Sequence, residues 1–340
     1  MDSKSWVRIP PGPHLVELNM PAYPAWSVRR YIYSTVSLPP ELRSVLSQYA
    51  EVAEAGAGGA ALDLEKVEVL LCGPVVAEEL DRMRSLRLIQ CVYAGVDGLP
   101  WGHIRDDVVV ASNAGSNADA VAEHAFALLL AAAKRVAFFD SRMRSGLFDI
   151  TGESRMLYGR RILVLGLGAI GRRVAEIARA FKMRVAGYAR SRRGDEPVEE
   201  LYLEGELEKA LAGADYAVIS LPLNKHTRGL ITYQRLSLMN RQGILVNIGR
   251  APIVVREDIL RFLKENPTFT YATDVWWNPQ NMREEMDLIA LPNVVSTPWI
   301  AGAASSREVY QEMLRTAVEN VVRYLRGERV QNIVRHEDYK

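Results

Sequence analysis

The sequence predicts an α/β fold of two domains, each built on a parallel sheet. Three observations support this. The 340 residues exceed what one ordinary hydrophobic core accommodates. Apolar β-branched runs alternate with helical segments along most of the chain, which is the pattern of strands joined by crossover helices. A glycine-rich turn follows an apolar run at residues 161–171, in the middle of the chain.

A complete α/β stretch precedes that turn, so we expect one domain to be assembled from both chain ends. Residues 1–112, completed by 305–340, form this substrate or catalytic domain, and residues 113–304 form an inserted dinucleotide-binding domain. Its expected elements alternate in order: strand 25–33, helix 40–49, strand 67–71, helix 75–83, strand 86–93 and strand 108–112. The small-residue tract 55–61 predicts a loop.

The inserted domain is expected to begin with a long helix at residues 118–135, capped by Ser116 or Asn117. Residues 140–158 have no regular pattern. Strands are then predicted at 161–165, 184–188, 216–221, 243–248, 270–274 and 294–296, with helices between them, the first at 172–181. A final helix at 306–326 returns the chain to the first domain.

The glycine-rich turn has the spacing of a dinucleotide fingerprint. Gly166 permits the tight turn, Gly168 lets the backbone approach a pyrophosphate, and Gly171 lets the following helix pack on the strand. The unpaired N–H groups at the start of that helix would then hold the pyrophosphate, and Ala169 and Ile170, which lie between the glycines, are expected to bind the cofactor as well. Three glycines alone would also fit a simple strand-to-helix turn. The strand before, the helix after and the next strand favour a bound dinucleotide.

The composition excludes several classes of protein. The net charge of +1 provides no field for nucleic acid, and no apolar run reaches the roughly 18 residues of a membrane span. Hydrophobic content of 49% and charged content of 24% are typical of a globular protein. Cys72 and Cys91 lie in apolar segments, which favours reduced thiols in a cytoplasmic protein over a structural disulfide. We predict no metal site.

The end of the second strand of the dinucleotide fold bears on cofactor choice. An acid about 18 residues beyond Gly171 would grip the ribose 2′-OH of NAD, but that position is Ala189. Arg190, Ser191 and Arg192 follow, and arginine forks suit a phosphate. This favours NADP, while NAD stays open. The alternative is a solvated basic loop, because two acids follow at 195–196.

Arg250 directly follows a predicted strand, so it should project from the carboxyl edge of the sheet, where ligands bind in open α/β folds. A guanidinium at that edge can clamp a carboxylate and polarise an adjacent keto oxygen. An arginine in a surface ion pair is the alternative.

Taken in order, the motifs of the chain resemble those of the D-isomer-specific 2-hydroxyacid dehydrogenase family. They are Tyr93-Ala-Gly-Val-Asp97, Asn117-Ala-Asp-Ala-Val-Ala-Glu123-His124, Gly166 to Gly171, Leu221-Pro222 to Leu230, Asn247-Ile-Gly-Arg250, Asp274-Val275 and Thr297-Pro298. The resemblance implies a flavodoxin-like and a dinucleotide-binding domain with a cleft between them. It also implies a homodimer that reduces small 2-oxo acids, or oxidises 2-hydroxy acids, with a nicotinamide cofactor.

The same resemblance implies roles for single residues. Arg250 would bind and polarise the substrate, and the turn Tyr93, Ala94 and Gly95 would hold its carboxylate. Asp274 would receive the nicotinamide carboxamide. The remaining cofactor contacts would come from two loops and include Leu221, Pro222, Thr227, Ile248 and Gly249, together with Arg250.

Two departures from the family pattern affect catalysis. Trp299 follows Pro298 where the family has its general-acid histidine, and residues 275–280 contain no glutamate to support one. Tyr93, at the expected catalytic position, or a water could replace the acid. Trp276, Trp277 and Trp299 either pack a wall of the site or form an apolar pocket. Formate oxidation, which forms no alkoxide, is an alternative activity, and a weakly catalytic cofactor-binding sensor or partner protein is another.

Overall fold

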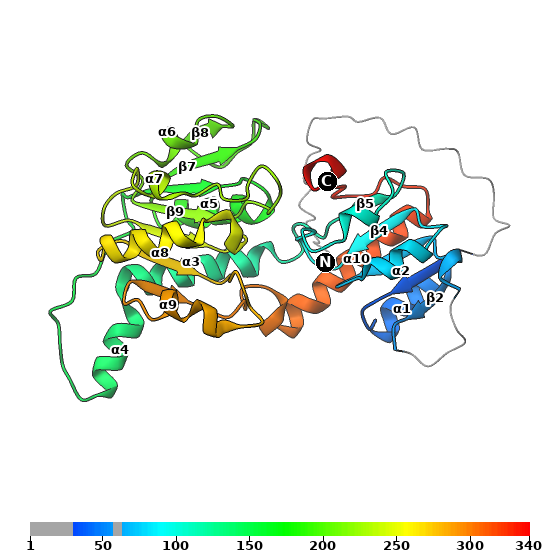
Figure 1. Cartoon of the computed structure of the whole chain (residues 1–340), viewed down its shortest axis with the longest axis horizontal. Coiled ribbons are helices and arrows are strands. Elements are labelled where there is room, and N and C mark those ends of the chain that lie inside the picture. The colour runs from blue at the N-terminus through cyan, green and yellow to red at the C-terminus, as the bar shows by residue number, and fades with distance from the viewer. Residues whose placement is uncertain (1–29, 57–62) are drawn as a thin grey trace, which may run out of the picture.

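The computed structural model describes residues 30–56 and 63–340. It contains two sheets of parallel strands with helices between the strands, which confirms the predicted fold class (Figure 1). We call the five-stranded sheet with its helices the smaller domain and the seven-stranded sheet with its helices the larger domain. The domain limits at 112 and 304 stay predictions.

The smaller domain has the strand order β2-β1-β3-β4-β5. Helix α10 packs on α1, β3 and β4, and its Leu314 and Val321 share a core with Leu71 and Leu88. Beyond α10 the chain returns to the sheet edge, where Ile333 pairs with Ala111. The elements are β1 (Tyr31–Ser34), α1 (Pro40–Ser47), β2 (Glu51–Glu54), β3 (Val69–Cys72), α2 (Ala77–Arg82), β4 (Leu88–Cys91), β5 (Val109–Ala111) and α10 (Arg307–Leu325).

The larger domain has the strand order β12-β11-β10-β9-β6-β7-β8. The chain direction across the sheet reverses between β6 and β9, which places a ligand crevice at the carboxyl ends of those two strands. The strands are β6 (Arg161–Leu165), β7 (Arg184–Ala189), β8 (Glu200–Leu203), β9 (Tyr216–Ile219), β10 (Ile244–Asn247), β11 (Thr270–Thr273) and β12 (Val294–Ser296). The helices are α3 (Ala118–Lys134), α4 (Val136–Arg144), α5 (Ala169–Ala180), α6 (Leu207–Leu211), α7 (Tyr233–Leu236), α8 (Arg256–Glu265) and α9 (Met286–Ile289).

Both faces of the larger sheet are buried, which explains why its strands are almost uninterrupted apolar runs. Along β6, Ile162 and Val164 join the core under α3 and α5, whereas Leu163 and Leu165 join the core under α6 and α8. Side chains alternate between the faces of a strand, so each face requires its own apolar set. The rigid sheet then fixes the positions of the loops at its carboxyl edge.

Several predicted boundaries were incomplete. Strands β2 and β8 were missed because both are short edge strands with glutamates and partial exposure, and their apolar signal is weak. The stretch 140–158, predicted as irregular, begins inside α4. Asn117 occupies the N-cap position of α3, but its side chain makes no capping hydrogen bond. Residues 25–29 of the first predicted strand and 57–61 of the predicted loop lie outside the described residues.

Cys72 and Cys91 occupy paired positions on β3 and β4, with their sulfur atoms 3.8 Å apart. Both are buried free thiols, as predicted, and the contact with Cys91 together with burial raises the pKa of Cys72. A cytoplasmic location stays a prediction. None of the helices within 30–56 and 63–340 has the length and hydropathy required to cross a membrane.

Candidate active site

The glycine-rich turn between β6 and α5 has the geometry that its sequence predicts. Gly166 has a φ of +96°, in the region that favours glycine. A Cβ atom on Gly171 would lie 1.8 Å from the carbonyl oxygen of Gly166, so only glycine allows α5 to approach the turn this closely. The Ser220 hydroxyl donates to the same oxygen at 2.8 Å. These contacts hold the start of α5 against the carboxyl ends of β6 and β9.

The first turn of α5 is suited to an anion. Gly168 is the N-cap of this 12-residue helix, and no side chain caps it. A Cβ on Gly168 would meet no atom of the described chain within 4 Å, so the backbone is accessible there. The N–H groups of Ala169 and Ile170 belong to this first turn, where the helix dipole favours negative charge. The site therefore fits the pyrophosphate of a dinucleotide.

The loops after β9 and β10 adjoin the glycine-rich turn. A Cβ on Gly166 would lie 3.1 Å from Leu221, and a Cβ on Gly249 would lie 2.8 Å from the Leu221 carbonyl oxygen. The Thr227 hydroxyl donates to the Pro222 carbonyl at 2.6 Å, and this bond closes the first of these loops. Ile248 donates its N–H to Ile219. The structure thus brings together the predicted cofactor loops, although contact with a cofactor stays a prediction.

The exposed residues Arg190, Ser191 and Arg192 follow β7, where the adenosine ribose would lie. The two acids of this loop are engaged elsewhere: Asp195 pairs with Arg172 at 2.8 Å, and Glu196 accepts backbone N–H groups. Neither acid of this loop therefore pairs with Arg190 or Arg192. Arg190 instead contacts Asp338 from the C-terminal end of the chain at 3.1 Å.

Arg250 lies against the turn after β4, so residues of both domains meet at one point. Its Nε atom donates to both carboxylate oxygens of Asp97, at 3.1 and 3.2 Å, and its Nη1 donates to the Gly249 carbonyl at 2.9 Å. A Cβ on Gly95 would lie 1.7 Å from Nη2 of Arg250. Any side chain at position 95 would displace the guanidinium. Glycine is therefore required for this close approach, and Asp97 fixes the orientation of Arg250.

Tyr93 and Ala94 begin the same turn. The Tyr93 carbonyl accepts the N–H of Asn113 at 3.1 Å, which ties the turn to the end of β5. The Tyr93 ring is 40% exposed, and its Cε2 would lie 3.4 Å from a Cβ on Gly73. The ring is accessible, and its hydroxyl makes no hydrogen bond with the described residues, so a proton-donating role stays a prediction.

Asp274 is almost fully buried and holds the loop that contains Trp299. It accepts the hydroxyl of Thr297 at 2.6 Å and the N–H groups of Ile300 and Ala301 at 2.9 and 2.8 Å. Trp299 has a φ of +60°, which turns these two consecutive N–H groups toward one carboxylate. A carboxylate has about four acceptor positions. Three are occupied by these hydrogen bonds, and Nε2 of His124 lies 3.6 Å from one of the carboxylate oxygens, so the carboxamide contact stays a prediction.

His124 stabilises this loop. Thr297 donates its only O–H to Asp274, so the 2.9 Å contact between the Thr297 oxygen and Nε2 of His124 requires that nitrogen to donate. Trp276 donates its indole N–H to the Thr297 carbonyl at 3.0 Å. Trp299 itself is 56% exposed. Position 299 therefore carries an accessible indole, whose N–H can donate a hydrogen bond but is far too weak an acid to serve as a general acid at neutral pH.

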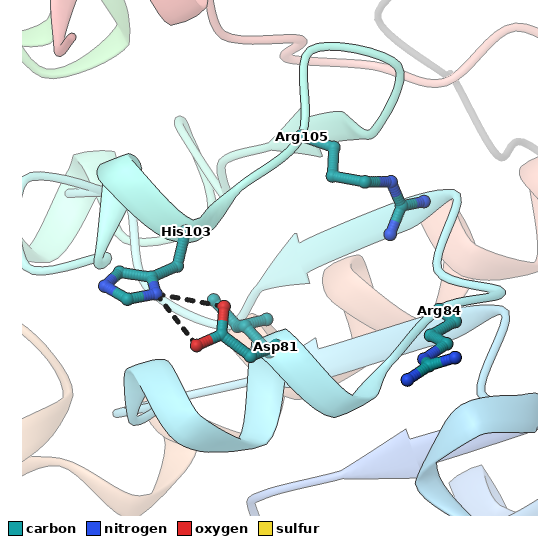
Figure 2. A pocket seen from close by; sticks show the side chains of 5 residues that line it. Asp81, Arg84, His103 and Arg105 are labelled. Atoms are coloured by element: carbon teal, nitrogen blue, oxygen red, sulfur yellow. Dashed lines mark hydrogen bonds and ion pairs between the residues drawn. The ribbon is translucent and has the colours of Figure 1, made fainter.

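Figure 2 shows a shallow hollow in the smaller domain, separate from these residues. Its volume is about 270 Å³, and it is lined by Leu80, Asp81, Arg84, His103 and Arg105. Arg105 already donates to Asp107 and to two backbone carbonyls, and His103 pairs with Asp81 at 3.0 Å. The hollow contains no predicted site residue. No group of three or more potential metal ligands occurs in the part of the chain that the structure describes.

The sequence reasoning missed three residues at the site. Asp97 ends the motif Tyr93-Ala-Gly-Val-Asp97, and its place four residues after Tyr93 was the available signal for its pairing with Arg250. Asp338 and Tyr339 had no such signal, because they reach Arg190 and the surroundings of Asp97 only through the return of the chain after α10.

Comparison with known proteins identifies the family. Residues 126–301 match the family model for the NAD binding domain of D-isomer specific 2-hydroxyacid dehydrogenases. A glyoxylate reductase of Aeropyrum pernix is 32% identical over 312 residues, which cover 89% of this chain and 88% of that one.

Two solved structures extend the comparison. A provisionally assigned formate dehydrogenase of Pyrobaculum aerophilum has a TM-score of 0.84 and 43% identity, covering 91% of this chain and 99% of that one. A D-isomer specific 2-hydroxyacid dehydrogenase of Xanthobacter autotrophicus in complex with NADPH has a TM-score of 0.76 and 26% identity, covering 92% and 99%. The chain therefore belongs to the D-isomer-specific 2-hydroxyacid dehydrogenase family and is an NAD(P)-dependent oxidoreductase of that type.

Proposed function

We propose that this protein reduces a small 2-oxo acid of the glyoxylate or hydroxypyruvate class with NADPH, using an altered proton relay. The observation that carries the proposal is the position of Arg250 against the Gly95 turn, with Asp97 holding its Nε. This arrangement leaves Nη2 facing the turn whose backbone would share the substrate carboxylate. The glyoxylate reductase named above is 32% identical, which supports the same substrate class.

The chain's own residues divide the work. The Tyr93–Gly95 turn and Arg250 bind the carboxylate and align the keto carbon. The positive charge of Arg250 stabilises the negative charge that develops on the keto oxygen. A bound nicotinamide would supply the hydride. Asp274, through its remaining acceptor position, would orient the carboxamide and so the face of the ring.

The preference for NADPH rests on Arg190, Ser191 and Arg192. The residue at the end of β7 is Ala189 rather than an acid, and the acids of the following loop pair with Arg172 and with backbone N–H groups. The 26% identical relative with bound NADPH supports the choice. NADH remains the alternative that the experiment below distinguishes.

The final proton must reach the product without a histidine at position 299. We expect Tyr93 or a water molecule to deliver it. Loss of a positioned general acid lowers the rate by roughly 10²- to 10⁴-fold. The protein should therefore turn over slowly, although its binding residues are complete.

The test follows the absorbance of NADPH and of NADH, separately, on mixing with glyoxylate, hydroxypyruvate, pyruvate and phenylpyruvate. Turnover with any of these acids, faster with NADPH, supports the proposal. Tight cofactor binding without turnover across the panel would contradict it and leave a cofactor-binding sensor or partner protein.

Formate oxidation is the second candidate. Its product is carbon dioxide, no alkoxide forms, and no general acid is needed, which suits a site with Trp299 in the acid position. The 43% identity to the provisionally assigned formate dehydrogenase favours it as well. The same assay run in reverse, with formate and oxidised cofactor, distinguishes it from 2-oxo acid reduction.

We also propose that the protein is a homodimer joined through α4 and the segment that follows it. Figure 1 shows α4 projecting away from the larger domain. Phe148 and Ile150 are 85% and 79% exposed. Residues 136–158 contain five more exposed apolar side chains: Val136, Met143, Leu147, Met156 and Tyr158. Exposed apolar surface of this extent marks a protein interface.

Replacing Phe148 and Ile150 with Asp should produce monomers in sedimentation velocity, whereas Val76→Asp, an exposed apolar residue elsewhere, should not. An unchanged mass for the double variant would contradict the proposed interface.

A further inference from the structure

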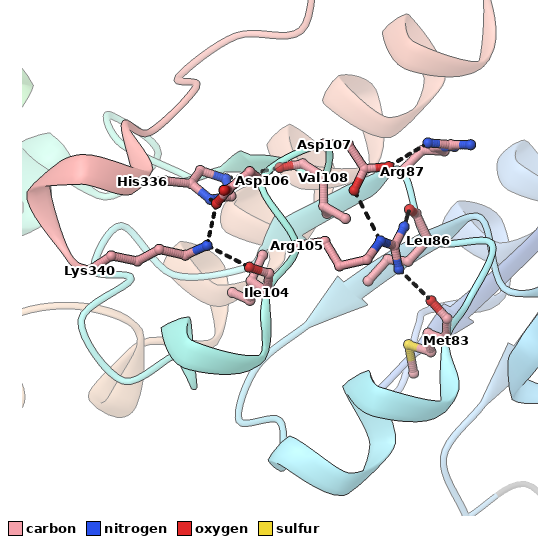
Figure 3. A network of polar contacts seen from close by, with 10 residues as sticks. All are labelled: Met83, Leu86, Arg87, Ile104, Arg105, Asp106, Asp107, Val108, His336 and Lys340. Atoms are coloured by element: carbon pink, nitrogen blue, oxygen red, sulfur yellow. Dashed lines mark hydrogen bonds and ion pairs between the residues drawn. The ribbon is translucent and has the colours of Figure 1, made fainter.

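The last residues of the chain are anchored firmly to the smaller domain. We call residues 330–340 the C-terminal segment. Tyr339 stacks on Trp101 with ring centroids 4.7 Å apart, and His336 meets the edge of the same indole. Lys340 donates to the Ile104 carbonyl and pairs with Asp106, as Figure 3 shows. The segment also joins the sheet edge through the bridge at Ile333.

From this anchor the segment reaches the larger domain. Asp338 pairs with Arg190 at 3.1 Å and lies 3.6 Å from Nε2 of His226. Its carbonyl accepts the N–H of Lys225 at 3.3 Å, and Lys225 also donates to the carbonyl of Lys340. Figure 1 shows the C-terminal turn, in red, at the side of the smaller domain that faces the larger one.

The contact between Asp338 and Arg190 lies at the carboxyl end of β7. Arg190 is the first residue after β7, where dinucleotide folds bind the adenosine ribose. The chain has no acid at this strand end, yet the C-terminal segment brings one to it. Asp338 is only 14% exposed, so its charge is less screened than that of an ordinary surface acid.

We propose that Asp338, which the C-terminal segment supplies, is a determinant of cofactor specificity. Its carboxylate competes with the 2′-phosphate of NADP for the guanidinium of Arg190. The inference rests on the proposed role of Arg190 in NADPH binding. When NADPH binds, its 2′-phosphate must either replace the Asp338 carboxylate at the guanidinium or lie beside that carboxylate. Either arrangement lowers the affinity of the protein for NADPH. The neutral 2′-OH of NADH meets no such repulsion. Asp338 therefore narrows the preference for NADPH that Arg190, Ser191 and Arg192 create.

The experiment measures the dissociation constants of NADPH and NADH by isothermal titration calorimetry, without substrate. Asp338→Asn removes the charge and keeps the size. Glu337→Gln is the matched control, because Glu337 is the neighbouring acid, is 73% exposed and pairs with Arg335 rather than Arg190. Arg190→Ala and the double variant D338N/R190A complete a cycle that isolates the coupling between Asp338 and Arg190.

We expect D338N to bind NADPH about three- to tenfold more tightly, with NADH affinity nearly unchanged. The gain should shrink in high salt and vanish in the R190A background, and E337Q should change neither constant. Weaker binding of both cofactors by D338N would show a structural role and overturn the inference.

The cycle also separates the two proposals. R190A should lose about tenfold or more in NADPH affinity. If it does so and D338N shows no gain, the role of Asp338 is wrong while the proposed cofactor stands. If R190A leaves NADPH binding unchanged, the proposed 2′-phosphate site is wrong, and the inference about Asp338 fails with it.

Discussion

The carboxyl edge of the larger sheet has two parts that differ in how far they keep the family pattern. Around β6, β9 and β10, the glycine-rich turn, the Leu221 loop and Arg250 keep that pattern, and the structure packs them against one another. Around β11 and β12, Asp274 and Thr297 lie together, but position 299, where the resemblance places a histidine, is Trp, and residues 275–280 contain no glutamate.

The difference indicates which steps of the reaction this chain retains. In the proposed function, binding a cofactor and aligning a 2-oxo acid depend on the first part. Delivering a proton would depend on the second. The absence of a histidine at position 299 and the absence of a glutamate at 275–280 are consistent with each other. A carboxylate that only supports a protonated imidazole has no purpose where there is no imidazole. We therefore expect strong binding with a slow chemical step.

Among substitutions that remove an interaction, the largest effect should come from Arg250. Arg250→Ala removes the carboxylate clamp and leaves Asp97 without its guanidinium partner. We expect kcat/KM for a 2-oxo acid to fall about 10²- to 10³-fold, with cofactor affinity less affected. Arg261→Ala, which removes an exposed arginine paired with Glu265, is the control. Nearly unchanged kcat/KM in R250A would show that the substrate is anchored elsewhere.

An intermediate effect is expected at Gly168. A Cβ there meets no described atom within 4 Å, so Gly168→Ala should fold with an unchanged melting temperature. The methyl group would nevertheless occupy the approach to the first turn of α5, and the dissociation constant of NADPH should rise about tenfold or more. Gly102→Ala, also in open space but in the smaller domain, should alter neither quantity. Unchanged NADPH binding in G168A would place the pyrophosphate elsewhere.

The smallest effect concerns Tyr339, on the segment that links the two domains. Burial, and then the charges of Asp97 and Asp338, raise its pKa from 10.0 to about 12. The folded state therefore favours the neutral phenol. The resulting stability is fully present below pH 10 and is lost as the pH rises toward 12.

Tyr339→Phe removes that ionisation, so its melting temperature should decline less than that of the wild type across this alkaline range. Tyr31→Phe, which alters a partly exposed tyrosine elsewhere in the smaller domain, should follow the wild type. Identical alkaline profiles for Y339F and the wild type would show that the buried phenol does not contribute.

The main features of the fold could be predicted because buried parallel strands are apolar runs and their alternation with helices is visible. The short edge strands β2 and β8 were not predicted, since half-exposed strands with glutamates lack that signal. The first turn of α5 lies at Ala169, three residues before the predicted start, because the helix begins directly at the Gly168 cap.

The candidate site was predictable where one motif contains its own partners, as in the glycine-rich turn. It was not predictable where the partners are distant in sequence. The pairing of Arg250 with Asp97 spans 153 residues, and that of Arg190 with Asp338 spans 148. Such pairs depend on how the two domains face each other, which local patterns do not contain.

The central claim is that the binding residues are complete and that position 299 has no histidine to donate the proton. The most direct test is the turnover of Trp299→His combined with Pro279→Glu, against Trp299→Phe with Pro279→Gln as control. Histidine tolerates the positive φ at position 299 better than a β-branched residue would. We predict that kcat rises about 10²- to 10⁴-fold in the first variant alone, with NADPH affinity unchanged. No gain, with the fold and cofactor binding intact, would contradict the claim.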